Sequence, residues 1–295
     1  MPGTPRIRRA HNDLVNPKKV RIGSGMPIGV LSDSNGSGYP AYWSTYANFG
    51  DRLTPLLIQR IHKVKVRHVP RRGQVPPVWV IGVGSILTHR SLTGAFVWGT
   101  GVVKPQLRLT GKPRKVLVVR GPLTRDWLVK QGVDCSGVIF GDPGLLVSRW
   151  FAPATKKVNR LAVVPHRVDF DHSWVKKCRK QAGVVVVDLN WPVDRVIQSI
   201  TSAEAVLSSS LHGLIAADAY GIPSLWVEFS DKVWGAGFKF RDYQLSLGGP
   251  VHEALRISNS VTVTDCISKA EPRTVELDMD EIIRRCPTKS MLGVS

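Results

Sequence analysis

The residues best suited to chemistry form one short run, Ser208-Ser209-Ser210-Leu211-His212. An apolar segment precedes the run, and apolar residues at helical spacing follow it until Gly221 and Pro223. The pattern predicts a strand, a serine-capped turn and a helix with His212 in its first turn. Free N–H groups and the helix dipole make such a turn an anion site. A histidine there can hold a phosphate or carboxylate or move a proton, although the same pattern fits a capped helix whose histidine packs in the core.

Further polar residues follow predicted strands or open predicted helices. Arg120 ends an apolar stretch, and from a strand end an arginine can fork onto a carboxylate or phosphate. His166 follows another strand and suits a general acid or base, or an ordinary loop. Asp142 lies in a Gly-Asp-Pro turn, where it is either a turn residue or an orienting carboxylate. Lys239 offers a second cation to an anionic ligand.

The elements that must position these residues alternate between strand and helix in both halves of the chain. This alternation predicts parallel sheets of βαβ units, the α/β class. In such sheets ligands bind beyond the carboxyl ends of the strands, where these polar residues fall. We expect a flexible basic arm over 1–26, an N-terminal domain over 27–152, a C-terminal domain over 153–265 and a tail with a helix over 266–295. The pattern also predicts a loop over 33–46 and a last strand over 261–263.

Charge and composition narrow the class of partner. The net charge of +19 suits an anionic partner such as nucleic acid, a phosphorylated metabolite, an acidic polysaccharide or a membrane surface. The four cysteines show no CxxC pair, which argues against a zinc site or a disulfide framework and favours a reducing compartment. No apolar run reaches the roughly 18 residues of a membrane span, and we find no signal peptide. We therefore expect a cytoplasmic protein, with peripheral contact at the inner face of the membrane left open.

Several common site types are missing from the sequence. It has no GxGxxG opening a helix, no Walker A pattern, no GxSxG elbow and no HExxH or tight His/Asp cluster. We accordingly expect no metal and no cofactor. Basic groups and histidines at helix starts favour recognition of a small phosphorylated anion.

An ordered set of motifs resembles the polysaccharide pyruvyl transferase family. The motifs are residues 48–51 (NFGD), 119–125 (VRGPLTR), 141–143 (GDP), 208–214 (SSSLHGL), 219–223 (AYGIP) and 239–243 (KFRDY). They span roughly residues 45 to 245 in the family's order. The chain departs from the family at Ser210, where many members carry an arginine before the Leu-His pair. Lys239, Arg241 or Arg125 would then supply the missing cation.

The resemblance implies two Rossmann-like domains facing across a cleft, as in the GT-B glycosyltransferases. It also implies transfer of the enolpyruvyl group of phosphoenolpyruvate to a sugar, with formation of a pyruvate ketal and loss of phosphate, in exopolysaccharide or cell-surface glycan biosynthesis. The donor would lie against Arg120, Ser210, Leu211, His212 and Lys239. The acceptor would be a saccharide, free or lipid-linked.

The chemistry calls for two acid/base groups, because C3 of the donor gains a proton and a sugar hydroxyl loses one. We assign His212 as general acid or phosphate ligand, His166 as base or acceptor contact, and Asp142 as an orienting carboxylate. Arg120 would stabilise the leaving phosphate. To the acceptor we assign the five residues Asn48, Asp51, Tyr42, Trp43 and Trp234, whose aromatic rings stack on sugars or, alternatively, pack in the core.

Two other functions fit the sequence. A GT-B glycosyltransferase that uses a nucleotide sugar would place Glu228 or Asp231 near its donor. A non-catalytic protein that binds polyanions would explain the charge of +19, but it requires a continuous basic stripe interleaved with aromatics, and the basic residues here are scattered. We therefore expect no nucleic-acid partner.

Overall fold

The computed structural model describes residues 20–22, 26–28, 30–31, 38–46, 48–154 and 156–294, with side chains from residue 38 onward. Most of the predicted flexible arm, residues 1–19 and 23–25, lies outside the described residues. Between these segments, β1 (Val20–Ile22) pairs antiparallel with β2 (Met26–Ile28).

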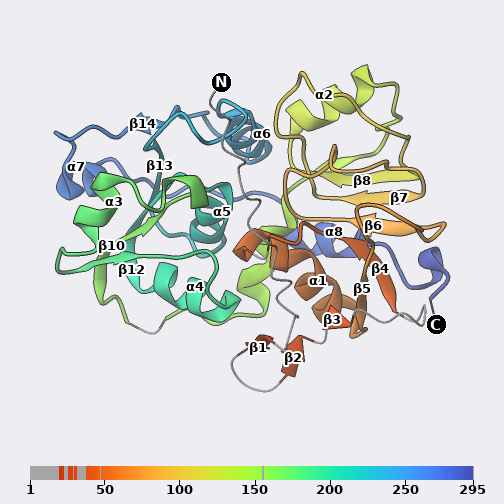
Figure 1. Ribbon diagram of the computed structural model, residues 1–295, viewed down its shortest axis with the longest axis horizontal. Helices are drawn as coiled ribbons and strands as arrows, with labels where there is room; N and C mark the ends of the chain where they lie inside the picture. The colour runs from red at the N-terminus through yellow and green to blue at the C-terminus, as the bar shows by residue number, and fades with distance from the viewer. Residues whose placement is uncertain are drawn as a thin grey trace, which may run out of the picture.

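The first lobe is built on a parallel sheet of seven strands in the order β3-β5-β4-β6-β7-β8-β9. The strands are β3 (Val30–Leu31), β4 (Tyr39–Tyr42), β5 (Val66–His68), β6 (Trp79–Ile81), β7 (Ala95–Trp98), β8 (Lys115–Val119) and β9 (Ile139–Phe140). Helices α1 (Phe49–His62) and α2 (Pro122–Lys130) follow β4 and β8. The 3₁₀ helix η1 (Pro143–Arg149) then leads out of the lobe (Figure 1).

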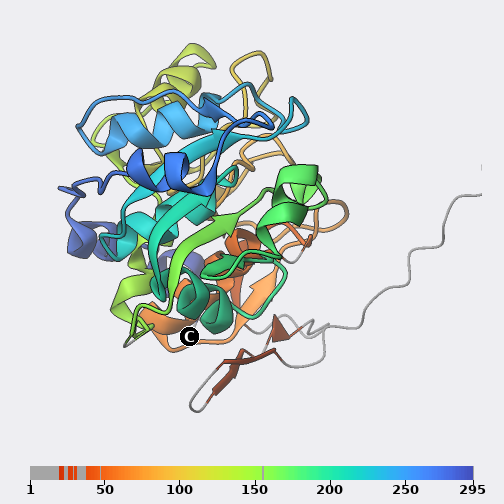
Figure 2. The same ribbon diagram turned by 90° about the vertical axis from the view of Figure 1, so that its left-hand side faces the viewer.

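The second lobe holds a parallel sheet of five strands in the order β11-β10-β12-β13-β14. The strands are β10 (Asn159–Val164), β11 (Val184–Val186), β12 (Ala203–Ser208), β13 (Ser224–Glu228) and β14 (Leu255–Arg256). The helices are η2 (Arg167–Asp169), α3 (Ser173–Cys178), α4 (Val193–Thr201), α5 (Leu211–Ala219), α6 (Phe238–Ser246) and α7 (Val263–Ser268). Figure 2 faces this lobe and shows its strands running between helices. The predicted α/β class with parallel sheets is confirmed.

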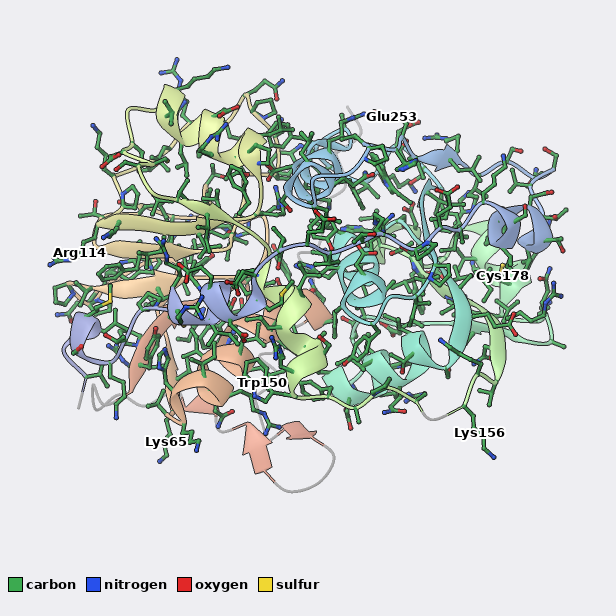
Figure 3. All side chains as sticks on the ribbon, turned by 180° about the vertical axis from the view of Figure 1, so that it is seen from behind. Lys65, Arg114, Trp150, Lys156, Cys178 and Glu253 are labelled. Carbon is green, nitrogen blue, oxygen red and sulfur yellow. The ribbon has the colours of Figure 1, made fainter. Side chains whose placement is uncertain are left out.

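The end of the chain returns to the first lobe (Figure 1). Helix α8 (Met279–Arg284) and the 3₁₀ helix η3 (Ser290–Leu292) close the chain. The indole of Trp98 donates to the carbonyl of Ile282 at 2.9 Å, and the Tyr39 hydroxyl donates to the carbonyl of Pro287 at 2.6 Å. Figure 3 shows Trp150, at the end of η1, between Arg114 of the first lobe and Cys178 of the second.

Two sequence predictions of the fold are wrong. The predicted loop over 33–46 contains β4, which lies inside the first sheet because buried Tyr39 and Ala41 find partners in β5 and β6; residues 33–37 lie outside the described residues. The predicted strand over 261–263 ends instead in the start of α7, because Thr262 and Asp265 form a capping box. The Thr262 hydroxyl accepts from the Asp265 N–H at 3.1 Å, and the Thr262 N–H donates to the Asp265 carboxylate at 2.8 Å.

Candidate active site between the two lobes

A cleft of about 220 Å³ lies between the two lobes, at the carboxyl ends of both sheets. Its walls are drawn from residues 44–51 after β4 and 84–89 after β6, and from 166–167 after β10 and 210–212 after β12, with Leu189 and Lys239. Strands β4 and β6 are neighbours in the first sheet, and β10 and β12 are neighbours in the second. Between the two strands of each pair, the order in which the chain adds strands to the sheet reverses direction. Such a switch point is where open α/β sheets bind ligands. The cleft therefore joins the binding positions of both sheets.

A larger cavity of about 380 Å³ lies in the second lobe, between β13, the end of α6 and residues 269–276. Its partly buried cation, Arg273, is already paired with Asp218 at 3.0 Å, and none of the predicted site residues lines it. Although this cavity is larger than the cleft, the chemistry favours the cleft between the lobes.

The serine run shapes the turn before α5. Ser208 accepts the Ser210 N–H at 3.0 Å, and its hydroxyl reaches the Val164 carbonyl at 2.9 Å. Ser209 accepts the N–H of His166 at 2.8 Å, which ties this turn to the end of β10. Ser210 is the N-cap residue of α5, but its side chain makes no cap hydrogen bond. The expected serine cap is therefore missing, and the Ser210 hydroxyl faces the cleft that it lines.

His212 lies where the first turns of α5 and α1 meet across the cleft. A methyl group on Gly50, in the first turn of α1, would come within 2.1 Å of the imidazole Nδ1, so only glycine allows this approach. The Phe49 N–H donates to the carbonyl of Leu189 in the second lobe at 2.7 Å. Burial, then Lys239 and Arg120, lower the pKa of His212 to about 3. The ring is therefore neutral at pH 7, and its Nε2 is buried without a hydrogen-bond partner among the described residues.

Lys239, in the first turn of α6, supplies positive charge to the cleft. Burial, and then the charge of Arg120, lower its pKa to about 8. No carboxylate of the described residues forms an ion pair with it, whereas most buried charges are paired. An unpaired, partly buried ammonium beside two neutral imidazoles is suited to an anionic ligand.

His166 faces the same cleft from the end of β10. Its Nδ1 accepts the Val168 N–H at 3.3 Å. Burial, then Lys239 and Arg167, lower its pKa to about 4. Like His212 it is neutral at pH 7, a state that accepts a proton more readily than it donates one.

Among the described residues that line the cleft, Asp51 is the one with a carboxyl side chain. Its N–H donates to the Asn48 side chain at 3.1 Å, which caps α1, and its carboxylate accepts from Ser44 and from the Asn48 backbone. Burial raises its pKa to about 7 against these hydrogen bonds and the charges of Arg52 and Arg167. Asp51 can therefore give or take a proton near neutral pH.

Arg120 and Asp142 lie behind the cleft wall. The fully buried Arg120 pairs with Asp242 at 2.9 Å and donates to the Ser85 hydroxyl at 2.6 Å and the Val102 carbonyl at 2.8 Å. It acts on the cleft through Ser85 and through its charge, and direct contact with a donor stays a prediction. Asp142 caps η1 by accepting the Gly144 N–H at 2.9 Å, and burial raises its pKa to about 6.

The aromatic residues predicted for the acceptor are not among the residues that line the cleft. Tyr42 and Trp43 are buried, so neither ring offers a face to a sugar. Trp234 is exposed, but it lies beside Lys104, whose ammonium is 4.7 Å from the ring centre, outside the residues that line the cleft. Sequence reasoning missed Tyr46 and Arg167, which do line it. Their position directly after two switch-point strands is the signal that could have found them.

Comparison with known proteins identifies the family. The sequence profile described as polysaccharide pyruvyl transferase matches residues 48–231, more than half of the chain. The chain belongs to the polysaccharide pyruvyl transferase family. This match begins at the cap of α1 and covers every cleft segment except residues 44–46 and Lys239.

Two relatives of this pyruvyl transferase chain differ in how much their names disclose. The succinoglycan biosynthesis protein ExoV of Rhizobium meliloti (strain 1021) is 30% identical over 219 residues, 71% of this chain and 65% of that protein. The uncharacterized protein L143 of Acanthamoeba polyphaga mimivirus is 27% identical over 245 residues, 77% of this chain and 82% of that protein.

The described residues contain no group of three or more His, Cys, Asp or Glu side chains placed to hold a metal ion. In the same part of the chain, no helix has the length and apolar character needed to cross a membrane.

Proposed function

We propose that the protein transfers the enolpyruvyl group of phosphoenolpyruvate to hydroxyls of a saccharide and forms a pyruvate ketal, in the biosynthesis of an exopolysaccharide or cell-surface glycan. The observation that carries this proposal is the cationic cleft, in which Lys239 has no acidic partner among the described residues and lies close enough to both neutral histidines to lower their pKa. Family membership and the relative named for succinoglycan biosynthesis support the class of reaction.

In this proposal the donor lies against Lys239, Ser210, Leu211 and His212. The Lys239 ammonium and the first turn of α5 attract its phosphate and carboxylate. Because His212 is neutral in the free protein, it is better suited to be a phosphate ligand than the initial acid. Arg120 stabilises the leaving phosphate from behind Ser85.

The acceptor approaches from the side of Asn48, Asp51 and His166. As protonated Asp51 gives its proton to C3 of the donor, the electrons of the C2–C3 double bond form the new C–H bond and C2 becomes electrophilic. An acceptor oxygen then bonds to C2 and gives its proton to the Asp51 carboxylate or to His166. Phosphate leaves with the electrons of its bond to C2, a second hydroxyl oxygen bonds to C2 in its place and closes the ketal, and the proton of that hydroxyl passes to the released phosphate. Asp142 helps by holding η1, which contacts both α1 and α5.

We extend the proposal to the setting of the reaction. The two lobes with a cleft between their sheets support a GT-B-like arrangement of two Rossmann-like domains, acting in the cytoplasm, where phosphoenolpyruvate is available. A lipid-linked acceptor would bring the enzyme to the inner face of the membrane.

The proposal is tested by incubating the protein with phosphoenolpyruvate and an oligosaccharide acceptor. The expected result is phosphate release together with a product heavier by one pyruvate ketal. Turnover of a nucleotide sugar instead would establish the glycosyltransferase alternative. Tight, salt-sensitive binding of nucleic acid without turnover would establish the polyanion-binding alternative.

Replacement of His212 by asparagine is expected to lower kcat/KM for phosphoenolpyruvate by roughly 100-fold or more, because the donor loses a contact at its reacting end. Initial rates of phosphate release measure the effect. His252→Asn is the matched control, because His252 is exposed and lies at the other cavity. Equal rates for wild type and His212→Asn would contradict the assignment.

The pH profile of kcat/KM for phosphoenolpyruvate should fall on its alkaline side because Lys239 loses its proton there. Its ammonium loses its proton as the pH rises through about 8, so kcat/KM for the dianionic donor is expected to fall above that pH. The histidines, with pKa values of about 3 and 4, contribute no limb near neutrality, whereas Asp51, with a pKa of about 7, contributes one that Lys239→Arg leaves in place. A kcat/KM profile over roughly pH 5 to 10 measures this, and Lys239→Arg should shift the basic limb upward. A limb that stays at pH 8 in Lys239→Arg would assign it to another group.

A further inference from the structure

The mouth of the cleft carries an exposed aromatic ring. Tyr46 follows β4, and its side chain is 69% exposed. Of the large hydrophobic side chains that are exposed in the described residues, Tyr46 is the only one that lines the cleft. The other apolar side chains of the cleft wall, Ile86, Leu189 and Leu211, are half-buried or buried, so this ring is the apolar surface most exposed to a ligand that enters from solvent.

A cation from the opposite lobe lies over this ring. The guanidinium carbon of Arg167, in the turn after β10, is 5.3 Å from the centre of the Tyr46 ring. Arg167 is itself exposed and makes no ion pair within 4 Å among the described residues. The exposure of Tyr46 shows that the guanidinium leaves much of the ring uncovered. Tyr46 and Arg167 therefore span the mouth of the cleft and present an aromatic surface with a positive edge.

The cleft that Tyr46 lines also holds hydrogen-bonding groups. Ser44, Asn48, His89 and Asp51 line it and offer both donors and acceptors. A pyranose has a matching surface, because one face exposes C–H groups while hydroxyls ring its edge. An apolar surface with a few placed polar groups is the usual composition of a small-ligand site.

We propose that Tyr46 and Arg167 form the subsite for the acceptor saccharide. A pyranose ring packs against the uncovered surface of Tyr46, and this directs its hydroxyls toward Asp51 and His166. Arg167 keeps the Tyr46 ring oriented from the opposite lobe and contacts ring hydroxyls at its edge. This inference rests on the proposed function and deepens it by naming the acceptor subsite. Tyr46 takes the place of the buried Tyr42 and Trp43 as the sugar-binding aromatic residue, and Trp234 is its rival for that role.

The proposal assigns the donor and the acceptor to different residues of the cleft, so it predicts different effects on their KM values. Lys239, Ser210 and His212 hold the donor, whereas Tyr46 touches only the acceptor. Tyr46→Ala should therefore raise KM for the acceptor by about 5- to 10-fold, the scale of one aromatic contact. The kcat and the KM for phosphoenolpyruvate should stay within about twofold of wild type. Tyr46→Phe should behave like wild type, and Arg167→Gln should give a smaller rise in acceptor KM.

The experiment uses a panel of p-nitrophenyl glucosides, galactosides and mannosides in both anomers as acceptor probes. Saturation-transfer NMR measures binding of each glycoside to the full chain without requiring turnover, and phosphate release with phosphoenolpyruvate measures transfer. Trp234→Ala tests the rival aromatic residue, which lies outside the cleft, and Met291→Ala, at another exposed residue outside the cleft, is the matched control. Thermal melting checks that each variant is folded.

Loss of glycoside binding in Tyr46→Ala, with binding kept in Tyr46→Phe and Trp234→Ala, supports the proposal. The proposal is overturned if no glycoside binds the wild type, if Trp234→Ala causes the loss instead, or if Tyr46→Ala raises the KM of both substrates equally, as a purely structural contact would. Glycoside binding through Tyr46 without phosphate release would keep the subsite and refute the pyruvyl transfer.

Discussion

Lys239→Met is expected to abolish donor turnover and at the same time to make the folded protein more stable. The wild-type ammonium is held in the fold with a pKa of about 8, whereas an unfolded lysine has a pKa near 10.5. At neutral pH the fold therefore stabilises this charge less well than water does, by at most about 3 kcal/mol. Methionine has a similar length and fills the same space without a charge.

The expected gain in the free energy of unfolding is about 1–3 kcal/mol, reduced because part of the side chain meets solvent. The sign follows from linkage: the folded pKa lies below the unfolded one, so wild-type stability is lower below pH 8 and rises as the pH passes from about 8 toward 10.5. The variant lacks this rise. Donor binding, in contrast, should fall at least 100-fold, because the other cation among the described residues that line the cleft, Arg167, stacks on Tyr46 at its mouth.

Urea unfolding at pH 7 and pH 10 and calorimetric titration with phosphoenolpyruvate measure the two effects. Lys232→Met is the matched control, because Lys232 is exposed and precedes the same helix. It should change neither quantity. A variant that is less stable than wild type, or that binds the donor with normal affinity, would show that Lys239 serves the fold and not the ligand. Opposite changes in stability and binding are typical of a residue kept for function.

Local sequence patterns were sufficient to predict the elements that present the site. Apolar spacing and stop residues identify α5. The placement of His166, Ser210 and His212 at strand or helix ends follows from such local signals. These residues line one cleft because parallel strands place their carboxyl ends on one edge.

The sequence alone does not predict which charged residues pair when they are far apart along the chain. Arg120 and Asp242 are 122 residues apart, and nothing local indicates that they form a buried pair. Their pairing changes the interpretation of Arg120 from a free ligand for an anion to a charge held behind Ser85. The pKa values of His212 and Asp51 also depend on burial between lobes, which composition and spacing do not disclose. For the same reason the sequence left open whether Tyr42 and Trp43 stack on a sugar or pack in the core, and both are buried.

Asp242→Asn is expected to cause the largest loss of stability, because it leaves Arg120 buried without its counter-charge. Asp242, on α6 of the second lobe, accepts from the Arg120 Nε at 3.0 Å and from the Thr124 hydroxyl and N–H at 2.6 and 2.9 Å, all in the first lobe. The contact is close: a methyl group on Gly121 would come within 1.8 Å of the Asp242 carbonyl oxygen. Breaking one partner of a buried pair costs about 3–5 kcal/mol.

A double-mutant cycle with Arg120→Gln, Asp242→Asn and the double variant isolates the pair. Because the double variant leaves no unpaired charge, its loss should be clearly smaller than the sum of the two single losses. Glu253→Gln is the control, because its partner Arg241 lies on the same helix as Asp242. Its partner Arg241 is only 2.6 Å away but the pair is exposed, so the expected loss is about 0–1 kcal/mol. Equal losses for Asp242→Asn and Glu253→Gln would mean that burial does not amplify the interlobe pair. A larger loss for Asp242→Asn would show that the contact which fixes the two walls of the cleft is also a main source of its stability.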